Sequence, residues 1–394
     1  MTDRATLRLK PGGDRRLLTG HPWIYSNEIE MTPETKALTP GVVVTVLRGD
    51  GKPLGTALFN PKPLISARLL SRDPQAQIDT WFLRQRLQRA LELRERLIGV
   101  PYYRLAHAEA DGLPGAVIDR YGDTLVIQAA NAGIERLAEP LLEALDGLLS
   151  PKAVLMRGEG AAREMEGLPA YSRLLKGNID GPVPVIEYQA KFLADPREGQ
   201  KTGWFFDQRD NRALVARFAK DKRVLDLYSY MGGFGIQSAL AGAAAVLSVD
   251  SSELALKAAT AAAEQNGVAG RFASEKAEVF EYLEATASQK TYDVVVADPP
   301  AFVKSKKDLN QGARGYRKLA RLAASRVSPN GILFIASCSH NMPVDEFNAQ
   351  VARGINDTGR AARVLVQSFA APDHPVHPAL PESAYLKALT LQID

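Results

Sequence analysis

Two segments of the C-terminal half carry side chains that could do covalent chemistry. The first is Ala297-Asp298-Pro299-Pro300-Ala301-Phe302, and the second is Ser337-Cys338-Ser339-His340, which holds the only cysteine of the chain. Each lies at the end of a short apolar run that is typical of a buried strand. Segments that leave the carboxyl ends of neighbouring parallel strands converge on one crevice. We therefore predict that Asp298 and Cys338 face one another across a pocket, where they could act covalently on an electron-poor ring.

A glycine-rich turn upstream is a candidate cofactor site. The apolar run 224–228 leads into Ser229-Tyr230-Met231-Gly232-Gly233-Phe234-Gly235, which opens a predicted helix. Glycines let the backbone approach a ligand closely, and the start of a helix offers free N–H groups. Asp226 precedes the turn, and Asp250 ends the next predicted strand, where it could accept both hydroxyls of a ribose.

Two cofactors compete for this turn. The nicotinamide dinucleotide fingerprint is G-x-G-x-x-G/A, but Ser238 stands three residues after Gly235, and the fingerprint does not explain Asp226. An acid there suits a cationic cofactor. S-adenosylmethionine carries a sulfonium, an ammonium and a ribose, and Glu278 could accept from its adenine amine. We favour S-adenosylmethionine; an ordinary tight turn is the structural alternative.

The positive charge of the chain is concentrated in two segments. Residues 1–73 carry eleven Lys and Arg against seven Asp and Glu, which accounts for the net charge of +4 of the whole chain. Residues 304–326 carry eight basic side chains against Asp308 alone. Either segment by itself could be a solvated helix face, but the pair favours an enzyme that binds a polyanion. The candidate substrate-binding residues are Pro299, Phe302, Lys304, Lys306, Lys307 and Arg314, with Phe302 either stacking on a base or packing in the core.

Composition narrows the class of protein. A chain of 394 residues with 45% apolar and 24% charged side chains predicts a globular protein of two or three domains. One cysteine excludes an internal disulfide, and no Cys/His cluster has zinc-ligand spacing, so we expect no metal. The N-terminus lacks the apolar core of a signal peptide, and no later run reaches membrane-spanning length. We therefore expect a cytoplasmic protein that binds no membrane.

The order of the elements predicts three parts. Residues 1–73 read as short strands broken by Gly and Pro, which favours a small barrel, and residues 74–184 read as a small α+β domain with a long helix over 78–97. Residues 185–394 alternate regularly between strand and helix, which predicts a doubly wound parallel sheet. Its predicted strands are 224–228, 245–249, 292–296, 331–336, 362–369 and 385–393, and its helices lie near 207–219, 234–241, 252–266, 279–287, 310–327 and 345–355.

Taken together, the motifs resemble one family. Gly20-His21-Pro22-Trp23-Ile24-Tyr25 looks like an N-terminal PUA domain, 109–115 and 119–123 look like a central domain, and 199–212 looks like the entry to a catalytic domain. Over nearly the whole chain, this combination resembles the RlmI-like bacterial large-subunit ribosomal RNA cytosine-C5 methyltransferases. The resemblance implies an RNA-binding PUA-type β-barrel, a small central α+β domain and a Rossmann-like methyltransferase sheet. It also implies 23S rRNA as the partner, and it leaves a homodimer open.

The resemblance also assigns roles to residues. Cys338 matches the cysteine that attacks the base, and Asp298 matches the acid beside it. The site of S-adenosylmethionine would comprise Asp207, Arg209, Asp226, Tyr228, Gly232, Gly233, Phe234, Asp250, Ser251, Glu278 and Asp298. Common RNA cytosine methyltransferases carry a second cysteine where this chain has Pro300, so a one-cysteine cycle is implied, and the base that removes the C5 proton is not assigned.

Two other functions remain open at this point. Asp298-Pro299-Pro300 followed by an aromatic residue is close to what adenine amine methylation uses, and related family members that methylate a guanine ring nitrogen share this turn. The target could therefore be guanine N7 or an exocyclic amine. The chain could also be a non-catalytic RNA-binding assembly factor with a vestigial cofactor site. The presence of Asp226, Asp250 and Asp298 together argues against such decay.

Overall fold

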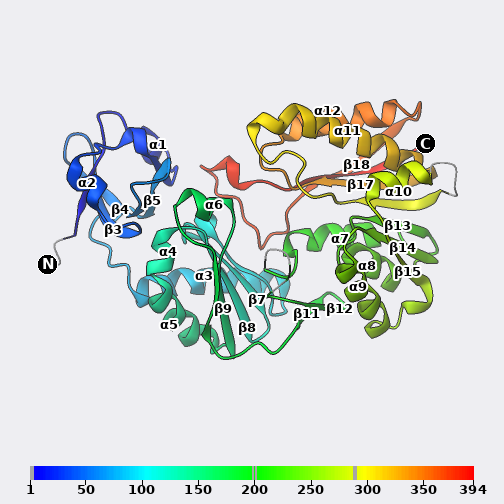
Figure 1. The fold of residues 1–394 in the computed structure, drawn as a ribbon, viewed down its shortest axis with the longest axis horizontal. Coiled ribbons are helices and arrows are strands. Elements are labelled where there is room, and N and C mark those ends of the chain that lie inside the picture. The colour runs from blue at the N-terminus through cyan, green and yellow to red at the C-terminus, as the bar shows by residue number, and fades with distance from the viewer. Residues whose placement is uncertain (1–3, 198, 200–201, 287–290) are drawn as a thin grey trace. The chain divides into compact units, whose positions relative to one another are not determined.

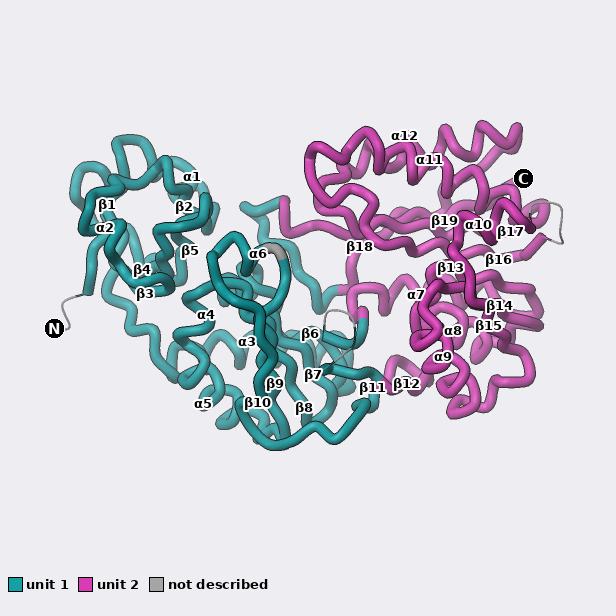
Figure 2. Tube along the Cα trace, in the orientation of Figure 1, with its two compact units in different colours: residues 1–184, 194–204, 372–381 teal, residues 185–193, 205–371, 382–394 magenta. Residues whose placement is uncertain are grey.

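The computed structural model describes residues 4–197, 199, 202–286 and 291–394. The chain forms two compact units (Figure 2): unit 1 comprises Met1–Pro184, Ala194–Trp204 and Pro372–Pro381, and unit 2 comprises Val185–Leu193, Phe205–Ala371 and Glu382–Asp394. Gln200 and Lys201 of the predicted 199–212 motif lie outside the described residues. Within the described part of the chain, no helix combines the length and the apolar character that crossing a membrane requires.

Unit 1 begins with a five-stranded sheet in the order β1-β3-β4-β5-β2. β1 and β3 run parallel, and the other neighbours are antiparallel. A single bridge between Leu9 and Ile29 joins the segments that follow the two edge strands, as expected of a sheet that curls toward closure. Leu7, Val46 and Phe59 pack in its core. The elements are β1 (Thr6–Arg8), α1 (Arg15–Leu18), β2 (Trp23–Tyr25), α2 (Pro33–Ala37), β3 (Val42–Leu47), β4 (Pro53–Phe59) and β5 (Ile65–Ser71).

A second five-stranded sheet follows in unit 1, in the order β10-β9-β8-β7-β6. The long helix α3 starts at Asp79, whose carboxylate accepts from Phe82 N, and ends at Gly99 with φ +74°, both usual helix caps. Its buried leucines pack with those of α5 against the sheet. The elements are α3 (Thr80–Ile98), β6 (Tyr102–His107), β7 (Ala116–Tyr121), β8 (Thr124–Ala129), α4 (Ala132–Arg136), α5 (Ala138–Leu149), β9 (Ala153–Gly158), α6 (Ala161–Met165) and β10 (Tyr171–Lys176).

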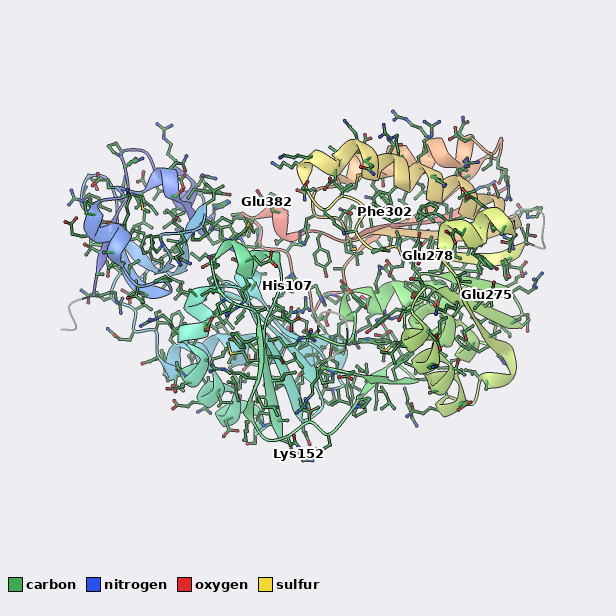
Figure 3. All side chains as sticks on the ribbon, viewed as in Figure 1. His107, Lys152, Glu275, Glu278, Phe302 and Glu382 are labelled. Atoms are coloured by element: carbon green, nitrogen blue, oxygen red, sulfur yellow. The ribbon has the colours of Figure 1, made fainter. Side chains whose placement is uncertain are left out.

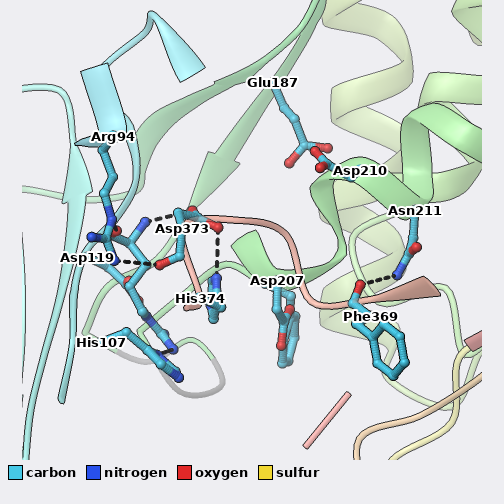
Figure 4. A network of polar contacts seen from close by, with 12 residues as sticks. Arg94, His107, Asp119, Glu187, Asp207, Asp210, Asn211, Phe369, Asp373 and His374 are labelled. Atoms are coloured by element: carbon cyan, nitrogen blue, oxygen red, sulfur yellow. Dashed lines mark hydrogen bonds and ion pairs between the residues drawn. The ribbon is translucent and has the colours of Figure 1, made fainter. Parts of the chain in front are cut away.

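Buried ion pairs tie the segment 372–381 to unit 1. Arg94 is fully buried, pairs with Asp111 at 2.6 Å, and donates to Asp373 O at 2.9 Å. Arg104 N donates to the Asp373 carboxylate at 3.0 Å, and the other carboxylate oxygen of Asp373 lies 2.8 Å from His374 Nδ1 (Figure 4). Because a buried charge is costly unless it is paired, these contacts fix this loop to α3 and β6.

Unit 2 contains a seven-stranded sheet in the order β15-β14-β13-β16-β17-β19-β18. The first five strands in this order, β15, β14, β13, β16 and β17, run parallel. β19 is inserted antiparallel between β17 and β18. The chain proceeds from β13 outward to β15 and then returns to β16 on the other side of β13, so the strand order reverses between β13 and β16. Ligands of open α/β sheets bind at such a reversal, outside the carboxyl ends of the strands.

Helices cover both faces of this sheet, α7, α8 and α9 on one and α10, α11 and α12 on the other (Figure 1). The doubly wound fold predicted from the sequence is therefore confirmed. A two-stranded sheet of β11 (Val183–Glu187) and β12 (Ala190–Ala194) precedes it. The remaining elements are α7 (Arg209–Ala216), β13 (Arg223–Leu227), α8 (Gly233–Leu240), β14 (Ala245–Asp250), α9 (Glu253–Gln265), β15 (Phe272–Lys276), α10 (Val279–Ala285), β16 (Tyr292–Ala297), α11 (Leu309–Ser325), β17 (Val327–Ser337), α12 (Val344–Asn356), β18 (Ala362–Phe369) and β19 (Lys387–Ile393).

Several element boundaries differ from the sequence prediction. The helix predicted over 310–327 ends at Ser325, because Val327 already pairs with Tyr292 in the sheet. Asn330, expected in a turn before the strand, lies inside β17 with φ +61°, where the register shifts. β15 lies outside the predicted strand ranges because four of its five side chains are exposed and three are polar, so no apolar pattern marks it.

Candidate active site

The chain makes a strained turn where β13 meets α8. Tyr228 and Tyr230 have φ +59° and +48°, a left-handed conformation that is uncommon for residues other than glycine and is found most often at functional sites. Gly235 N donates to Asp226 Oδ2 at 2.9 Å, and a Cβ on Gly235 would lie 2.7 Å from Ser248 Oγ. The glycine therefore permits an approach between helix and strands that a side chain would block.

Asp226 is a buried carboxylate that could accept a further hydrogen bond. Burial raises its pKa to about 7; the Gly235 N–H opposes this rise, and the negative charges of Asp298 and Asp250 add to it. Among the described residues, neither Asp226 Oδ1 nor Ser229 Oγ has a hydrogen-bond partner, although both are buried. Unsatisfied buried polar atoms are rare in folded proteins, so these two atoms mark a place where a polar ligand would complete the bonding.

Asp250 is held by the backbone around it. Tyr230 N and Ser252 N each donate to one of its carboxylate oxygens at 2.8 Å. Each oxygen keeps lone-pair capacity for the two ribose hydroxyls that the sequence predicted there. Ser251 and Glu278 are exposed at the same edge of the sheet, Glu278 directly before α10 (Figure 3). Burial raises the pKa of the Tyr228 hydroxyl, and Glu278 and Asp250 lie near enough to raise it further.

Asp298 follows β16 and is oriented by a residue that the predicted site did not include. Gln208 Nε2 donates to Asp298 Oδ1 at 2.9 Å, and Asn211 Nδ2 in turn donates to Gln208 Oε1 at 2.6 Å. Asn211 also lies 3.3 Å from Phe369 O (Figure 4). The amide of Gln208 thus fixes one carboxylate oxygen of Asp298. Only the 199–212 motif marks this residue in the sequence.

Asp207 and Arg209, predicted to contact the cofactor, are buried beside Gln208. The hydroxyl of Tyr385 donates to Asp207 Oδ2, and Asp207 O accepts from Ala371 N at 2.8 Å. The Arg209 guanidinium lies 5.5 Å from the centre of the Phe206 ring. These contacts brace the segment that carries Gln208.

The loops that follow β16 and β17 lie together, as the sequence predicted for neighbouring parallel strands. The half-buried Cys338 Sγ is 3.9 Å from Pro299 O, and Val303 N donates to Ser339 Oγ at 3.1 Å. The fully buried hydroxyl of Tyr316, on α11, lies within 2.9 Å of both Ser337 Oγ and Ser339 Oγ. A network of hydroxyl groups therefore holds the two serines that flank Cys338.

Phe302 packs between two aromatic rings. Its ring centre lies 4.8 Å from that of Tyr316 and 6.0 Å from that of Phe280. Because the side chain is only half-buried, one part of it stays accessible. The two ring contacts favour the alternative in which Phe302 packs in the core over the one in which it stacks on a base.

The basic segment 304–326 separates into two groups. Arg317 and Lys318 pair with Asp357 and Glu284 at 2.7 and 2.8 Å, and Arg326 is buried beside Tyr292. The exposed basic side chains without a carboxylate partner among the described residues are Lys304, Lys306, Lys307, Arg314 and Arg321. All four basic residues that the sequence predicted to bind substrate belong to this second group.

The carboxylates of Asp226, Asp250 and Asp298 make this edge of the sheet suited to a cation. Within the described ranges, no group of His, Cys, Asp and Glu side chains could hold a metal ion. An organic cation with hydrogen-bond donors fits the unpartnered Asp226 Oδ1 and the acceptors of Asp250, and S-adenosylmethionine has these features.

Comparisons with known proteins identify the family. A family model for PUA-like domains matches residues 7–72, and a model for S-adenosylmethionine-dependent methyltransferases matches residues 172–392. The chain is 39% identical to ribosomal RNA large subunit methyltransferase I of Shewanella denitrificans, over 98% of this chain and 99% of the relative. The chain belongs to this methyltransferase family. The relative of the same name from Pseudoalteromonas atlantica is 37% identical over the full length of both chains.

Solved structures agree on the fold of this methyltransferase. SMU.776 in complex with SAH superposes with a TM-score of 0.84 at 22% identity, over 98% of this chain and 100% of that chain. The predicted fold, a PUA-like N-terminal domain followed by a Rossmann-like methyltransferase domain, is confirmed, and so are the predicted family and the cofactor S-adenosylmethionine. When bound, this cofactor supplies an electrophilic methyl group on its sulfonium.

We expect the affinity for S-adenosylmethionine to rise with pH between about 6 and 8. The raised pKa of Asp226, about 7, means that below pH 7 the cation must displace a proton, which costs up to about tenfold in affinity per pH unit. By the same linkage, Asp226 contributes stability that is fully present below its unfolded pKa of about 3.9 and is lost as the pH rises through 7. Calorimetry at pH 6, 7 and 8 measures the binding. Asp226→Asn should bind with little pH dependence, and a flat profile for the wild type would contradict the expectation.

Proposed function

We propose that the protein forms 5-methylcytosine in large-subunit (23S) ribosomal RNA. The observation that carries this proposal is the meeting of the Asp298 and Cys338 loops, with Cys338 Sγ 3.9 Å from Pro299 O, at the sheet edge that holds the cofactor turn. The names of the relatives support a ribosomal RNA substrate. With such a substrate, we infer that the protein acts in the cytoplasm.

The chemistry requires both groups, because cytosine C5 is a weak nucleophile. The Cys338 thiolate adds to C6, and the C5–C6 π electrons become available at C5, which takes the methyl group from the sulfonium. C5 then loses its proton to a base, the electron pair restores the C5–C6 double bond, and the thiolate leaves. Asp298 accepts a hydrogen bond from the exocyclic amine or from a protonated N3, and so stabilises the addition.

The cofactor residues have four different roles under this proposal. Asp226 and Asp250 offer carboxylate oxygens, and Tyr228, Gly232, Gly233 and Phe234 form the turn that approaches the ligand. Ser251 and Glu278 flank it from the exposed edge. Asp207 and Arg209 act through the segment that carries Gln208, which orients Asp298. The segments 1–73, 74–184 and 185–394 serve RNA binding, linkage and catalysis.

Replacing Lys304, Lys306 and Lys307 together with Gln should weaken RNA binding and its dependence on salt. If each lysine contacts one phosphate, log affinity against log salt becomes shallower by about 2 for single-stranded RNA. Fluorescence anisotropy at several salt concentrations measures the slope. Arg317→Gln with Lys318→Gln is the matched control, since these side chains already pair with Asp357 and Glu284, and its slope should change less. Equal slopes for the wild type and the triple variant would contradict phosphate contact by this segment.

The product of the reaction tests the proposed function directly. The purified protein is incubated with S-adenosylmethionine and unmodified 23S rRNA, and the RNA is digested and analysed by mass spectrometry. The expected product is 5-methylcytidine. Transcripts that carry 5-fluorocytosine should trap the protein covalently, because fluorine cannot leave as a cation. A methyl group on guanine N7 or on an exocyclic amine, with no trapped protein, would replace the proposal with nitrogen methylation.

A further inference from the structure

Lys387 is a lysine whose side chain is buried. It opens β19, it is 3% exposed, and its ammonium donates to Ser339 O at 2.7 Å and to Met342 O at 2.8 Å. Within the described residues, no carboxylate forms an ion pair with it. A buried charge without a counter-charge is costly, and its position requires a reason beyond packing.

The register of the sheet brings Lys387 to the loop that carries Cys338. Ser337 and Lys387 are direct partners across the antiparallel pair β17–β19, and Ser339 O, which accepts from the ammonium, belongs to the residue that follows Cys338. Burial lowers the pKa of Lys387 to about 8, so that the side chain is charged at neutral pH, and Cys338 opposes this lowering through its negative charge. Cys338 is thus the ionisable side chain whose negative charge acts on the Lys387 ammonium.

Three other titratable residues of the described chain lie near Cys338. Tyr316 faces the cysteine from α11, but burial raises the pKa of its hydroxyl, which stays neutral. Asp298, after β16, is an acid. His340, in the same loop as Cys338, stacks on Tyr385 with ring centres 5.0 Å apart. Among these described residues, Lys387 is the only lysine or arginine.

We propose that Lys387 stabilises the thiolate of Cys338 and so prepares it for addition to the base. The thiol proton passes to solvent and the ammonium keeps its own protons, so Lys387 is a positioning residue that acts through Cys338. The use of the thiolate rests on the proposed function, but the ionisation does not. A cation beside a cysteine favours the thiolate, which is the reactive form.

The test uses the fact that Cys338 is the only cysteine of the chain. The rate of alkylation by iodoacetamide, followed by the mass of the intact protein, is measured against pH without RNA or cofactor. Lys387→Met should shift the midpoint of the profile upward by about one pH unit and slow alkylation at pH 7 by about tenfold. Lys387→Arg, which keeps the charge, should stay nearer the wild type. Lys257→Met, which removes an exposed lysine on α9, should leave the profile unchanged.

Each possible result of this experiment either upholds or overturns the proposed role of Lys387. Coincident profiles of the wild type and a folded Lys387→Met variant would overturn the proposal. If that variant does not fold, the wild-type profile decides alone, because a midpoint at or above the free-thiol value of about 8.5 would show no stabilisation. A lowered midpoint together with no 5-methylcytidine in RNA would uphold this inference and reject the proposed function. A covalent trap on 5-fluorocytosine with an unshifted Lys387→Met profile would do the reverse.

Discussion

Replacing Cys338 with alanine is expected to abolish methyl transfer while the affinity for S-adenosylmethionine stays nearly constant. Loss of the nucleophile should lower kcat by a factor on the order of 10⁴ or more, because C5 has no other route to a nucleophilic state. Cofactor affinity should change little, since the turn around Asp226 and Asp250 contains no atom of Cys338. Single-turnover kinetics measures the first quantity, and calorimetry with S-adenosylmethionine measures the second.

A matched variant distinguishes the loss of the nucleophile from the loss of the contacts that hold its loop. Ser339→Ala removes the hydroxyl that accepts from Val303 N, so it loosens the same loop but keeps the thiol. It should slow the reaction moderately and still form the adduct with 5-fluorocytosine RNA. Substantial turnover in Cys338→Ala would point instead to nitrogen methylation, in which the lone pair of the nitrogen attacks the sulfonium without an adduct.

The main frame of the site was predictable because it follows from local patterns. Asp226, Asp250 and Asp298 each stand at or next to the end of a short strand in a regular strand–helix alternation, and parallel strands bring such ends to one edge. The helix predicted over 78–97 is found as α3 because its leucines repeat at helical spacing and a capping acid and a glycine bound it. These signals lie within a few residues of the feature that they determine.

The supporting contacts were not predictable because they depend on sheet order and register. Lys387 meets the Cys338 loop only because β19 is inserted antiparallel beside β17, and nothing near Lys387 in the sequence indicates this partner. Gln208 reaches Asp298 across 90 positions of sequence. The strand β15 was not predicted for a different reason, since its exposed side chains do not form an alternating apolar pattern.

A second long-range contact, between Glu187 and Arg212, supports the cofactor turn. Glu187 closes β11 and is fully buried, and its two oxygens each accept from the Arg212 guanidinium at 2.7 Å. Arg212, on α7, also donates to Phe205 O at 2.7 Å. A Cβ on Gly233 would lie 2.9 Å from Arg212 Cδ, so the arginine packs directly against the first residue of α8.

Glu187→Ala should lower the free energy of unfolding by about 3–5 kcal/mol, because it removes the carboxylate that accepts two hydrogen bonds from the buried Arg212 guanidinium. Chemical denaturation measures this loss, and S-adenosylmethionine binding should weaken with it, since Arg212 packs against the turn. The control is Glu253→Ala, which breaks exposed pairs with Lys257 and Lys276 and should leave stability nearly unchanged. The double variant Glu187→Leu with Arg212→Met removes both charges and should recover much of the stability, because no buried guanidinium then lacks the two hydrogen bonds to Glu187. If this double variant proves no more stable than Glu187→Ala, the loss comes from packing around β11 instead.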